Sequence, residues 1–231
     1  MKPAILLVED DESLGYVLRE FLQSRGLDVT WVQDGAQGMK TFRLGRFDLC
    51  ILDIMMPAID GITLAELIRL HDPHVPILFL TARSMKQDVI RGFRAGADDY
   101  IRKPVNEEVL LARIEAVLRR AAPASPPSDP PEYAIGRYRL DCREQCLRFG
   151  EQTLPLTRRE FELLRLFCRR RGQLLPRREV LEKLWGRTDR QARKSMDVFL
   201  SRLRKKLAQD PSVRLENVHG QGFVLRVEEQ D

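Results

Sequence analysis

Short apolar runs alternate with helix-like repeats along the first half of the chain. Five runs are apolar enough to be buried strands, at residues 5–8, 29–32, 49–52, 77–80 and 100–101. Between and after them, apolar residues recur at intervals of three and four, which places them on one face of a helix. Buried strands that alternate with helices are typical of a parallel sheet covered on both faces. The first half is therefore predicted to be an α/β domain with five strand–helix units.

The pattern changes in the second half. Residues 134–156 alternate apolar and polar positions between turn signals, which predicts short strands. Thr157 with Glu160 makes a capping box that begins a helix, Pro176 begins a second helix, and Gly186 ends it. A third helix is expected from about 192 to 207, and a hairpin from 213 to 227. This half mixes strands and helices in a different order from the first.

Composition separates the two halves. Residues 121–132 hold five prolines, which predicts a semi-rigid, extended linker. We therefore expect a first domain at 1–120, a linker at 121–133 and a second domain at 134–231. The first domain carries 16 Lys and Arg against 18 Asp and Glu, whereas the second carries 23 against 14, a net charge of +9. This asymmetry points to a polyanion as partner of the second domain only, although a solvated basic surface is the plainer alternative.

Several classes of protein are disfavoured. No apolar run approaches the ~18 residues of a membrane span. The first residues lack a signal-peptide cleavage pattern, so we expect a cytoplasmic protein without a membrane partner. Four cysteines, Cys50, Cys142, Cys146 and Cys168, have no pairing pattern typical of zinc sites or structural disulfides. They are interpreted as buried or incidental thiols.

Polar side chains follow the strands of the predicted parallel sheet. Glu9 and Asp10 follow the first strand, Asp53 the third, Thr81 the fourth and Lys103 the fifth. Ligands bind beyond the carboxyl ends of such strands, so these groups are expected to share one crevice. Clustered carboxylates without nearby His or Cys favour Mg²⁺. With a lysine and a hydroxyl alongside, the crevice suits a phosphoryl group, and Asp53 is placed to be the nucleophile that receives it.

Residues 2–120 resemble a response-regulator receiver domain, which has a flavodoxin-like fold. The resemblance rests on "VEDD", "LDIMMP", "TAR" and "GADDYIRKP", in that order. It implies that Asp53 accepts a phosphoryl group from a sensor histidine kinase. It also implies a magnesium site formed by Asp10, Asp53, the backbone carbonyl of Met55 and, largely through water, Glu9. Thr81 and Lys103 would contact the phosphate, Lys103–Pro104 would be a cis peptide, and Tyr100 would rotate with Thr81 as a switch.

The third helix of the second half has two distinct faces. Its apolar stripe consists of Met196, Phe199, Leu200, Leu203 and Leu207. The opposite, outer face carries Lys194, Val198, Ser201 and Lys205, with Arg202 and Arg204 beside it. A valine among basic groups suits the major groove of DNA, where an apolar side chain can meet a thymine methyl while arginine reads guanine. A salt-bridged surface helix is the alternative.

Residues 134–228 resemble the α+β winged helix-turn-helix output domain of the OmpR/PhoB subfamily, through "SMDVFLSRLRKKL" followed by "VHGQGF". The resemblance implies base or near-base contacts from Lys194, Val198, Arg202 and Arg204, and DNA-backbone contacts from Ser195, Phe199 and Ser201. The loop at 186–192 would face RNA polymerase or flanking DNA. His219 stands where the subfamily's wing commonly has arginine, so a weaker minor-groove contact is expected.

Family members also dimerise through one face of the receiver domain, with a Lys/Arg–Glu pair across it. Val89 and Val109 occupy the matching positions here. Both are expected to be partly exposed and to meet across a homodimer, unless they pack within one chain. The polar pairs Asp99–Arg113 and Asp98–Arg120 would remain at this interface.

These features predict a regulator rather than an enzyme. Phosphorylation of Asp53 would favour a homodimer that binds two DNA half-sites. A DNA-binding regulator independent of phosphorylation is one alternative. An aspartyl-phosphate phosphatase is the other, but Met55 occupies the position where such enzymes carry a second aspartate.

Overall fold

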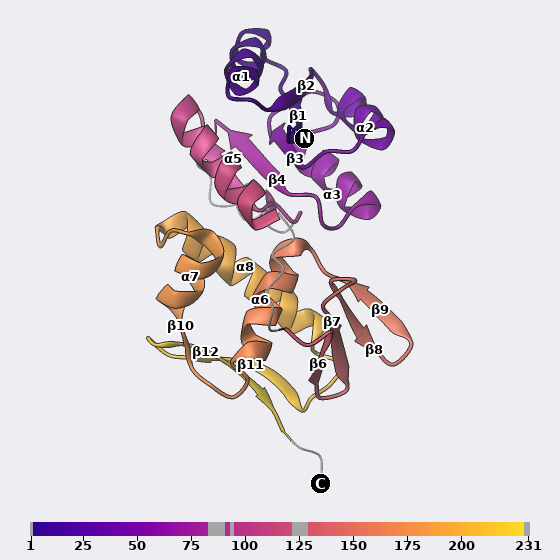
Figure 1. The fold of residues 1–231 in the computed structure, drawn as a ribbon, viewed down its shortest axis with the longest axis vertical. Helices are drawn as coiled ribbons and strands as arrows, with labels where there is room; N and C mark the ends of the chain where they lie inside the picture. Colours follow the sequence, from indigo (N-terminus) through magenta and orange to yellow (C-terminus); the bar gives the residue numbers. More distant parts are fainter. Residues whose placement is uncertain (1, 83–90, 93–94, 122–128, 229–231) are drawn as a thin grey trace. The chain divides into compact units, whose positions relative to one another are not determined.

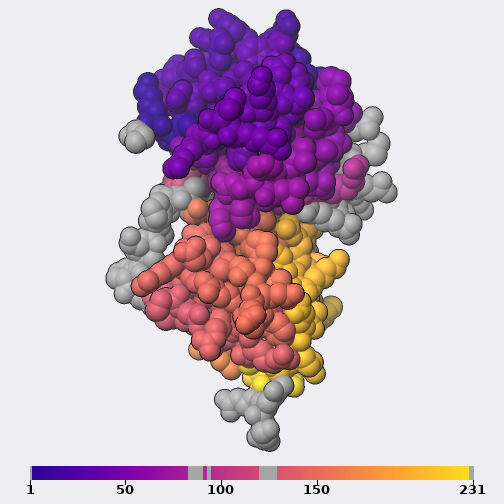
Figure 2. Space-filling model, turned by 90° about the vertical axis from the view of Figure 1, so that its right-hand side faces the viewer, coloured from indigo at the N-terminus to yellow at the C-terminus, as the bar shows by residue number. Residues whose placement is uncertain are grey.

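The computed structural model describes the chain except for residues 1, 83–90, 93–94, 122–128 and 229–231. The protein forms two compact units, Met1–Ala124 and Ser125–Asp231 (Figure 1). In the space-filling view the first unit runs from indigo to magenta and the second from orange to yellow (Figure 2). Each unit is therefore built from one continuous stretch of the chain.

A parallel sheet forms the centre of the first unit. Its strands are β1 (Ala4–Val8), β2 (Asp28–Val32), β3 (Leu49–Asp53), β4 (Ile77–Thr81) and β5 (Asp99–Arg102). They lie in the order β2-β1-β3-β4-β5, and every neighbouring pair is parallel. The prediction of a five-stranded, doubly wound sheet is confirmed. The direction of winding reverses between β1 and β3, where sheets of this kind bind ligands.

Helices cover both faces of this sheet (Figure 1). The helices α1 (Glu12–Ser24) and α5 (Glu107–Ala121) share one apolar core with the sheet, while α2 (Gly35–Leu44) and α3 (Gly61–His71) pack against each other. The helices α1, α2 and α3 begin after aspartates, Asp11, Asp34 and Asp60, whose carboxylates accept backbone N–H groups of the first turn. The helix expected around Val89 lies mostly outside the described residues.

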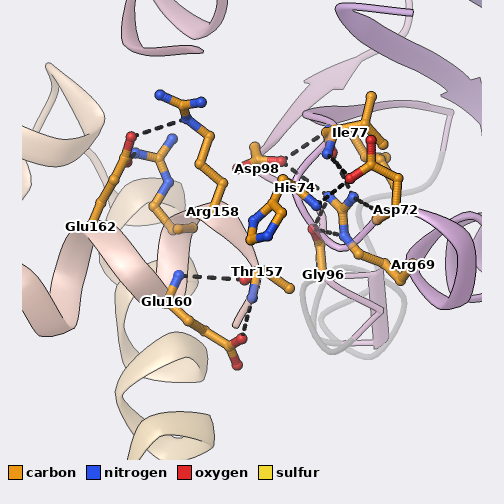
Figure 3. A network of polar contacts seen from close by, with 12 residues as sticks. Arg69, Asp72, His74, Ile77, Gly96, Asp98, Thr157, Arg158, Glu160 and Glu162 are labelled. Atoms are coloured by element: carbon orange, nitrogen blue, oxygen red, sulfur yellow. Dashed lines mark hydrogen bonds and ion pairs between the residues drawn. The ribbon is translucent and has the colours of Figure 1, made fainter. Parts of the chain in front are cut away.

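Arg69 of α3 fixes the segment that enters β5. Its guanidinium donates to the Gly96 carbonyl at 2.8 Å and to Asp98 Oδ2 at 3.3 Å (Figure 3). The same Asp98 oxygen accepts the backbone N–H of Ile77 at 2.9 Å. Asp98 is buried, so these bonds compensate for the loss of water around its charge. The start of β5 is thereby held beside the start of β4.

In its described residues, the second unit combines two antiparallel sheets with three helices. A four-stranded sheet contains β6 (Glu132–Ile135), β7 (Tyr138–Asp141), β8 (Cys146–Phe149) and β9 (Gln152–Pro155). The helices α6 (Arg158–Arg169), α7 (Arg177–Trp185) and α8 (Arg190–Lys206) follow. A second sheet has β12 (Gly222–Val227) between β10 (Leu175–Pro176) and β11 (Val213–Val218). This confirms the α+β prediction.

Local signals in the second unit act as the sequence indicates. Thr157 accepts the Glu160 N–H, and Glu160 accepts the Thr157 N–H, which completes the capping box of α6 (Figure 3). Gly186 ends α7 in the left-handed region at φ 66°. The folded unit begins earlier than expected, because β6 starts at Glu132 and Arg169 donates to Asp129 at 2.6 Å. The last residues of the expected linker are therefore anchored to α6.

Two further observations concern the described parts of the chain. None of the helices described is both long and apolar enough to cross a membrane. All four cysteines are free thiols, and burial raises the pKa of Cys50 to about 12.

Candidate functional site

Three carboxylates meet at the carboxyl ends of the central strands. Glu9 and Asp10 follow β1, and Asp53 ends the neighbouring β3. One ligand oxygen from each of these residues lies within 4.8 Å of those of the other two. Glu9 and Asp53 are buried, whereas Asp10 is exposed. These three residues are called the acid cluster. Two of its carboxylates are therefore buried, and the third lies at the protein surface.

Lys103 bridges the two buried members of the acid cluster. Its Nζ lies 2.6 Å from Glu9 Oε1 and 2.8 Å from Asp53 Oδ2. Desolvation opposes the charge of Lys103, but hydrogen bonds to Asp53 and Glu9 outweigh it and raise its pKa above the usual value. Lys103 thus remains a cation directly beside the Asp53 carboxylate. The expected cis peptide between Lys103 and Pro104 is confirmed.

Glu9 carries the strongest sign that a cation belongs in this pocket. Burial, offset in part by the hydrogen bond from Lys103, raises the pKa of Glu9 to about 7. Its Oε2 is buried and has no hydrogen-bond partner among the residues that the structure describes. A buried oxygen without a partner is costly, and a hard divalent ion would relieve it. The all-oxygen donor set and this orphaned atom fit Mg²⁺.

The remaining predicted receiver residues lie directly after β3 or on the neighbouring strands β4 and β5. The backbone N–H of Met55 donates to Asp53 Oδ1 at 3.2 Å, while the Met55 side chain is 46% exposed. Thr81 ends β4 beside β3 and is buried. Tyr100 on β5 is also buried, with its ring centroid 5.2 Å from that of Phe79. A carboxylate, a hydroxyl and an ammonium group therefore follow three adjacent strands.

In the second unit, α8 presents the expected basic outer face. Ser201 and Lys205 are exposed, and Lys194 and Val198 are half-buried. Asp189 caps the helix by accepting the N–H groups of Gln191 and Ala192. Arg190 and Arg193 add further exposed cations at this end.

Two expected DNA-backbone contacts need correction, because their side chains belong to the core. Ser195 is fully buried and its Oγ accepts the Trp185 indole N–H at 3.1 Å. Phe199 is also fully buried, with its ring 6.2 Å from that of Trp185. Both side chains fix α8 against α7 and do not reach the outer surface.

The arginines beside the outer face are engaged within the chain. Arg202 Nε lies 2.7 Å from Oε1 of the buried Glu160, so this nitrogen is bound to α6, and the expected base contact of Arg202 stays a prediction. Arg204 is exposed, and its Nε donates to the Leu215 carbonyl of β11 at 2.8 Å. His219 is exposed in the turn between β11 and β12. All three remain candidates for DNA contact.

The predicted dimer face is only partly described. Val109 on α5 is 46% exposed, whereas Val89 lies outside the described residues. Arg113 donates to Asp99 Oδ2 at 3.0 Å within the chain. The side chain of Arg120 is also outside the described part, so its pair with Asp98 stays a prediction. Asp98 is already bound by Arg69 within the chain, so Arg120 of a second subunit would have to bind Asp98 in addition to Arg69.

Sequence patterns missed two residues that contact these sites. Trp31 donates its indole N–H to the Glu9 carbonyl at 3.0 Å. Glu160, expected only as a capping residue, also receives Arg202 and Lys206 from α8. For Trp31, the available signal was a large aromatic residue at the end of β2. For Glu160, it was an acidic residue in a chain that also carries the basic helix α8.

Two family models match the chain, one in each unit. Residues 5–115 match the response regulator receiver domain. Residues 150–225 match the C-terminal domain of transcriptional regulatory proteins. The acid cluster and Lys103 lie in the first match, and α8 lies in the second.

Curated relatives align over nearly the whole chain. The transcriptional regulatory protein RprY of Bacteroides fragilis is 42% identical over 97% of this chain and 94% of its own. The transcriptional regulatory protein PrrA of Mycobacterium leprae is 36% identical over 98% and 97%. The sensory transduction protein RegX3 of Mycolicibacterium smegmatis is 34% identical over 96% and 98%.

Solved structures with the same extent are also similar. A cysteine-to-aspartate mutant of RitR has a TM-score of 0.79 at 26% identity, covering 98% of this chain and 100% of that one. DrrB of Thermotoga maritima, an OmpR/PhoB homologue, has a TM-score of 0.52 at 27% identity with the same coverage.

Proposed function

The chain belongs to the OmpR/PhoB-type response regulators of two-component systems, which are transcription regulators and not enzymes. From this premise we propose that phosphorylation of Asp53 controls the binding of the protein to DNA. A sensor histidine kinase is the phosphoryl donor. The observation that carries the proposal is the position of Asp53, whose Oδ2 lies 2.8 Å from Lys103 Nζ in a pocket with an orphaned Glu9 oxygen.

The chemistry at Asp53 is a single phosphoryl transfer. A carboxylate oxygen of Asp53 forms the new bond to phosphorus while the bond from phosphorus to the kinase histidine nitrogen breaks. The leaving imidazole keeps the electron pair and takes a proton from water. Lys103 stabilises the negative charge on the phosphoryl oxygens, and the Thr81 hydroxyl donates a hydrogen bond to one of them.

Glu9, Asp10, Asp53 and the Met55 carbonyl would hold Mg²⁺, which when bound supplies charge neutralisation for the phosphoryl group. Lys103 leaves one carboxylate oxygen of Glu9 for this role. Thr81 and Tyr100 follow the change at Asp53 and bias a receiver homodimer.

The second unit is the DNA-binding output. Lys194, Val198 and Ser201 on the outer face of α8, with Arg204, are the candidates for the major groove, and His219 is the candidate wing contact. Dimerisation raises DNA affinity by linking two such units, without any change in the binding surface itself. RNA polymerase is a further candidate partner, through residues 186–192, which form the turn before α8 and the first residues of that helix. The cytoplasm is the proposed location, because both the kinase phosphodonor domain and DNA are reached there.

The test combines a phosphorylation assay with DNA capture. Incubation with acetyl phosphate and Mg²⁺ should add one phosphoryl group to the parent, measured by intact mass spectrometry, and none to Asp53→Asn. Asp28→Asn, at an exposed position of β2, is the matched control and should react like the parent. Phosphorylated parent should then retain genomic DNA fragments more tightly than Asp53→Asn does.

Each alternative has its own outcome. Equal DNA capture by phosphorylated parent and Asp53→Asn would favour a regulator independent of phosphorylation. Sustained turnover of added phosphoesters would favour a phosphatase, which Met55 disfavours because it has no carboxyl group to act as general acid. A parent that gains no phosphoryl group would reject the proposal.

A further inference from the structure

We propose that Trp31 is a positioning residue for the acid cluster, acting through the main chain of Glu9. This inference rests on the proposed function, since it concerns how the same pocket binds Mg²⁺ and receives a phosphoryl group. The hydrogen bond from Trp31 goes to the main-chain carbonyl of Glu9 and not to a carboxylate of the acid cluster. The Trp31 indole instead sets the direction of the segment that carries Glu9 and Asp10.

Both backbone polar groups of Glu9 are bonded to the end of β2. The Glu9 N–H donates to the Val32 carbonyl at 3.1 Å, continuing the parallel register in which Val8 pairs with Val32. The Glu9 carbonyl accepts the Trp31 indole N–H at 3.0 Å. A side chain therefore replaces the next bond of the strand ladder at the point where β1 ends and the acid cluster begins.

Gly15 of α1 makes room for the indole. A Cβ atom at this buried glycine would lie 2.3 Å from Cε2 of Trp31 and 2.5 Å from its Nε1. Contacts that short do not occur, so any larger residue would push the indole and its N–H away from Glu9. Arg19, one turn further along α1, holds its guanidinium carbon 5.8 Å from the centre of the Trp31 ring. The indole is thus held by α1 while it holds Glu9.

The position of Glu9 matters because its side chain is constrained from the other end as well. Lys103 binds Oε1, and Oε2 has no hydrogen-bond partner in the part of the chain that the structure describes. The direction of Oε2 therefore depends mainly on the position of the Glu9 main chain. Hydrogen bonds that orient ligand-bearing residues are known to tune metal affinity, so loss of the Trp31 bond should be felt by a bound cation.

Trp31→Phe separates this role from packing, because phenylalanine retains an aromatic ring and removes only the N–H donor and some area. We expect Mg²⁺ affinity, measured by isothermal titration calorimetry, to fall by about two- to tenfold, the effect of one net hydrogen bond. The Mg²⁺ concentration needed for half-maximal phosphorylation by acetyl phosphate should rise by the same factor. The rate at saturating Mg²⁺ should stay near that of the parent.

Val29→Ala is the matched control. Val29 lies on the same strand and is buried in the receiver core, but it has no bond to Glu9. It should lower the melting temperature and leave Mg²⁺ affinity unchanged. If Val29→Ala weakens Mg²⁺ binding as much as Trp31→Phe, or if Trp31→Phe binds Mg²⁺ like the parent, the inference is wrong.

Gly15→Ala provides a second, independent variant, and alanine itself favours a helix. It should weaken Mg²⁺ binding through displacement of the indole, and unchanged binding would count against the inference. Trp185→Phe leaves Trp31 as the single tryptophan of the two in the chain, so its emission should change on addition of Mg²⁺. A parent that neither binds Mg²⁺ nor gains phosphate would overturn the proposed function together with this inference, whereas a normal parent with a normal Trp31→Phe overturns the inference alone.

Discussion

Arg202 Nε lies 2.7 Å from Oε1 of Glu160, which joins the basic helix α8 to the first turn of α6. Glu160 is fully buried and its other oxygen accepts both the Thr157 N–H at 2.7 Å and Lys206 Nζ at 3.1 Å. The same carboxylate therefore caps one helix and holds two cations of another. This arrangement fixes the direction of α8, and with it the face that carries Val198.

Replacing Arg202 with alanine should therefore destabilise the second unit more than it alters DNA recognition. The buried Glu160 carboxylate would keep Lys206 and the Thr157 N–H but lose one of its two cations. This loss should lower the free energy of unfolding by about 1–3 kcal/mol. Trp185 fluorescence during urea unfolding, in a Trp31→Phe background, measures this cost. DNA affinity should fall without a change in its salt dependence.

Lys205→Ala is the contrasting variant, because Lys205 is exposed on the outer face of α8. Its stability should match the parent, while the slope of log affinity against log salt should fall by about 1, the loss of one phosphate contact. The opposite pattern, with a lower slope for Arg202→Ala and normal stability, would return Arg202 to the DNA surface.

Lys103→Met tests the electrostatics of the acid cluster. Without this cation, Glu9 and Asp53 face each other uncompensated, so the Mg²⁺-free protein should melt at a lower temperature in EDTA. Mg²⁺ would no longer meet a positive charge, and its affinity should rise by about tenfold, equivalent to about 1.4 kcal/mol. The increase in melting temperature on adding Mg²⁺ should then exceed that of the parent.

Lys40→Met controls for the loss of a positive charge elsewhere, since Lys40 is exposed on α2. It should respond to Mg²⁺ like the parent. A smaller Mg²⁺ effect in Lys103→Met than in Lys40→Met would show that Lys103 does not repel the ion from this pocket.

Sequence patterns were sufficient to predict the features that depend on neighbouring residues or on the order of the strands. The apolar runs located all five strands, so the carboxyl-end residues Glu9, Asp53 and Lys103 could be brought together by topology alone. Thr157 and Gly186 marked helix ends because capping depends on a few neighbouring residues. These relations are local or follow directly from a parallel sheet.

Packing between helices was beyond the same reasoning. The angle of Ser195 around α8 did not reveal that Trp185 of another helix covers it. Phe199 is a different case, because its place in the apolar stripe already indicated a core position. Arg202 looked available for DNA because its partner, Glu160, lies 42 positions earlier in the sequence. The contact between Trp31 and Glu9 likewise depends on the space left by Gly15, which no periodicity encodes.

Asp210 should give the second unit a measurable dependence on pH. Burial opposes its ionisation, but hydrogen bonds from Ser212 and from the Arg137 N–H outweigh burial and lower the pKa of Asp210 below 3.8. A carboxyl group with a lowered folded-state pKa stabilises the fold above its unfolded pKa, and this contribution is lost as pH falls through the folded pKa. Asp210→Asn should therefore be less stable than the parent at neutral pH, and the difference should shrink below pH 3.8.

Trp185 emission in a Trp31→Phe background follows unfolding of the second unit for this comparison. Asp197→Asn is the control, because the Asp197 side chain is 54% exposed. Its stability difference from the parent should be small. A difference for Asp210→Asn that does not shrink as the pH falls would contradict the assigned role of its carboxylate.

Val109→Glu should weaken the receiver homodimer if that dimer forms through α5. Val109 is 46% exposed, so glutamate can be placed there without disturbing the core, but at an apolar contact between two copies each glutamate would be buried as an unpaired charge. Sedimentation velocity with acetyl phosphate and Mg²⁺ should show a dimer for the parent and mainly monomer for Val109→Glu. Val17→Glu, at a 45% exposed position of α1, is the matched control and should dimerise normally. Equal dimerisation of both variants would exclude Val109 from the interface, and equal loss would point to a general effect of the added charge.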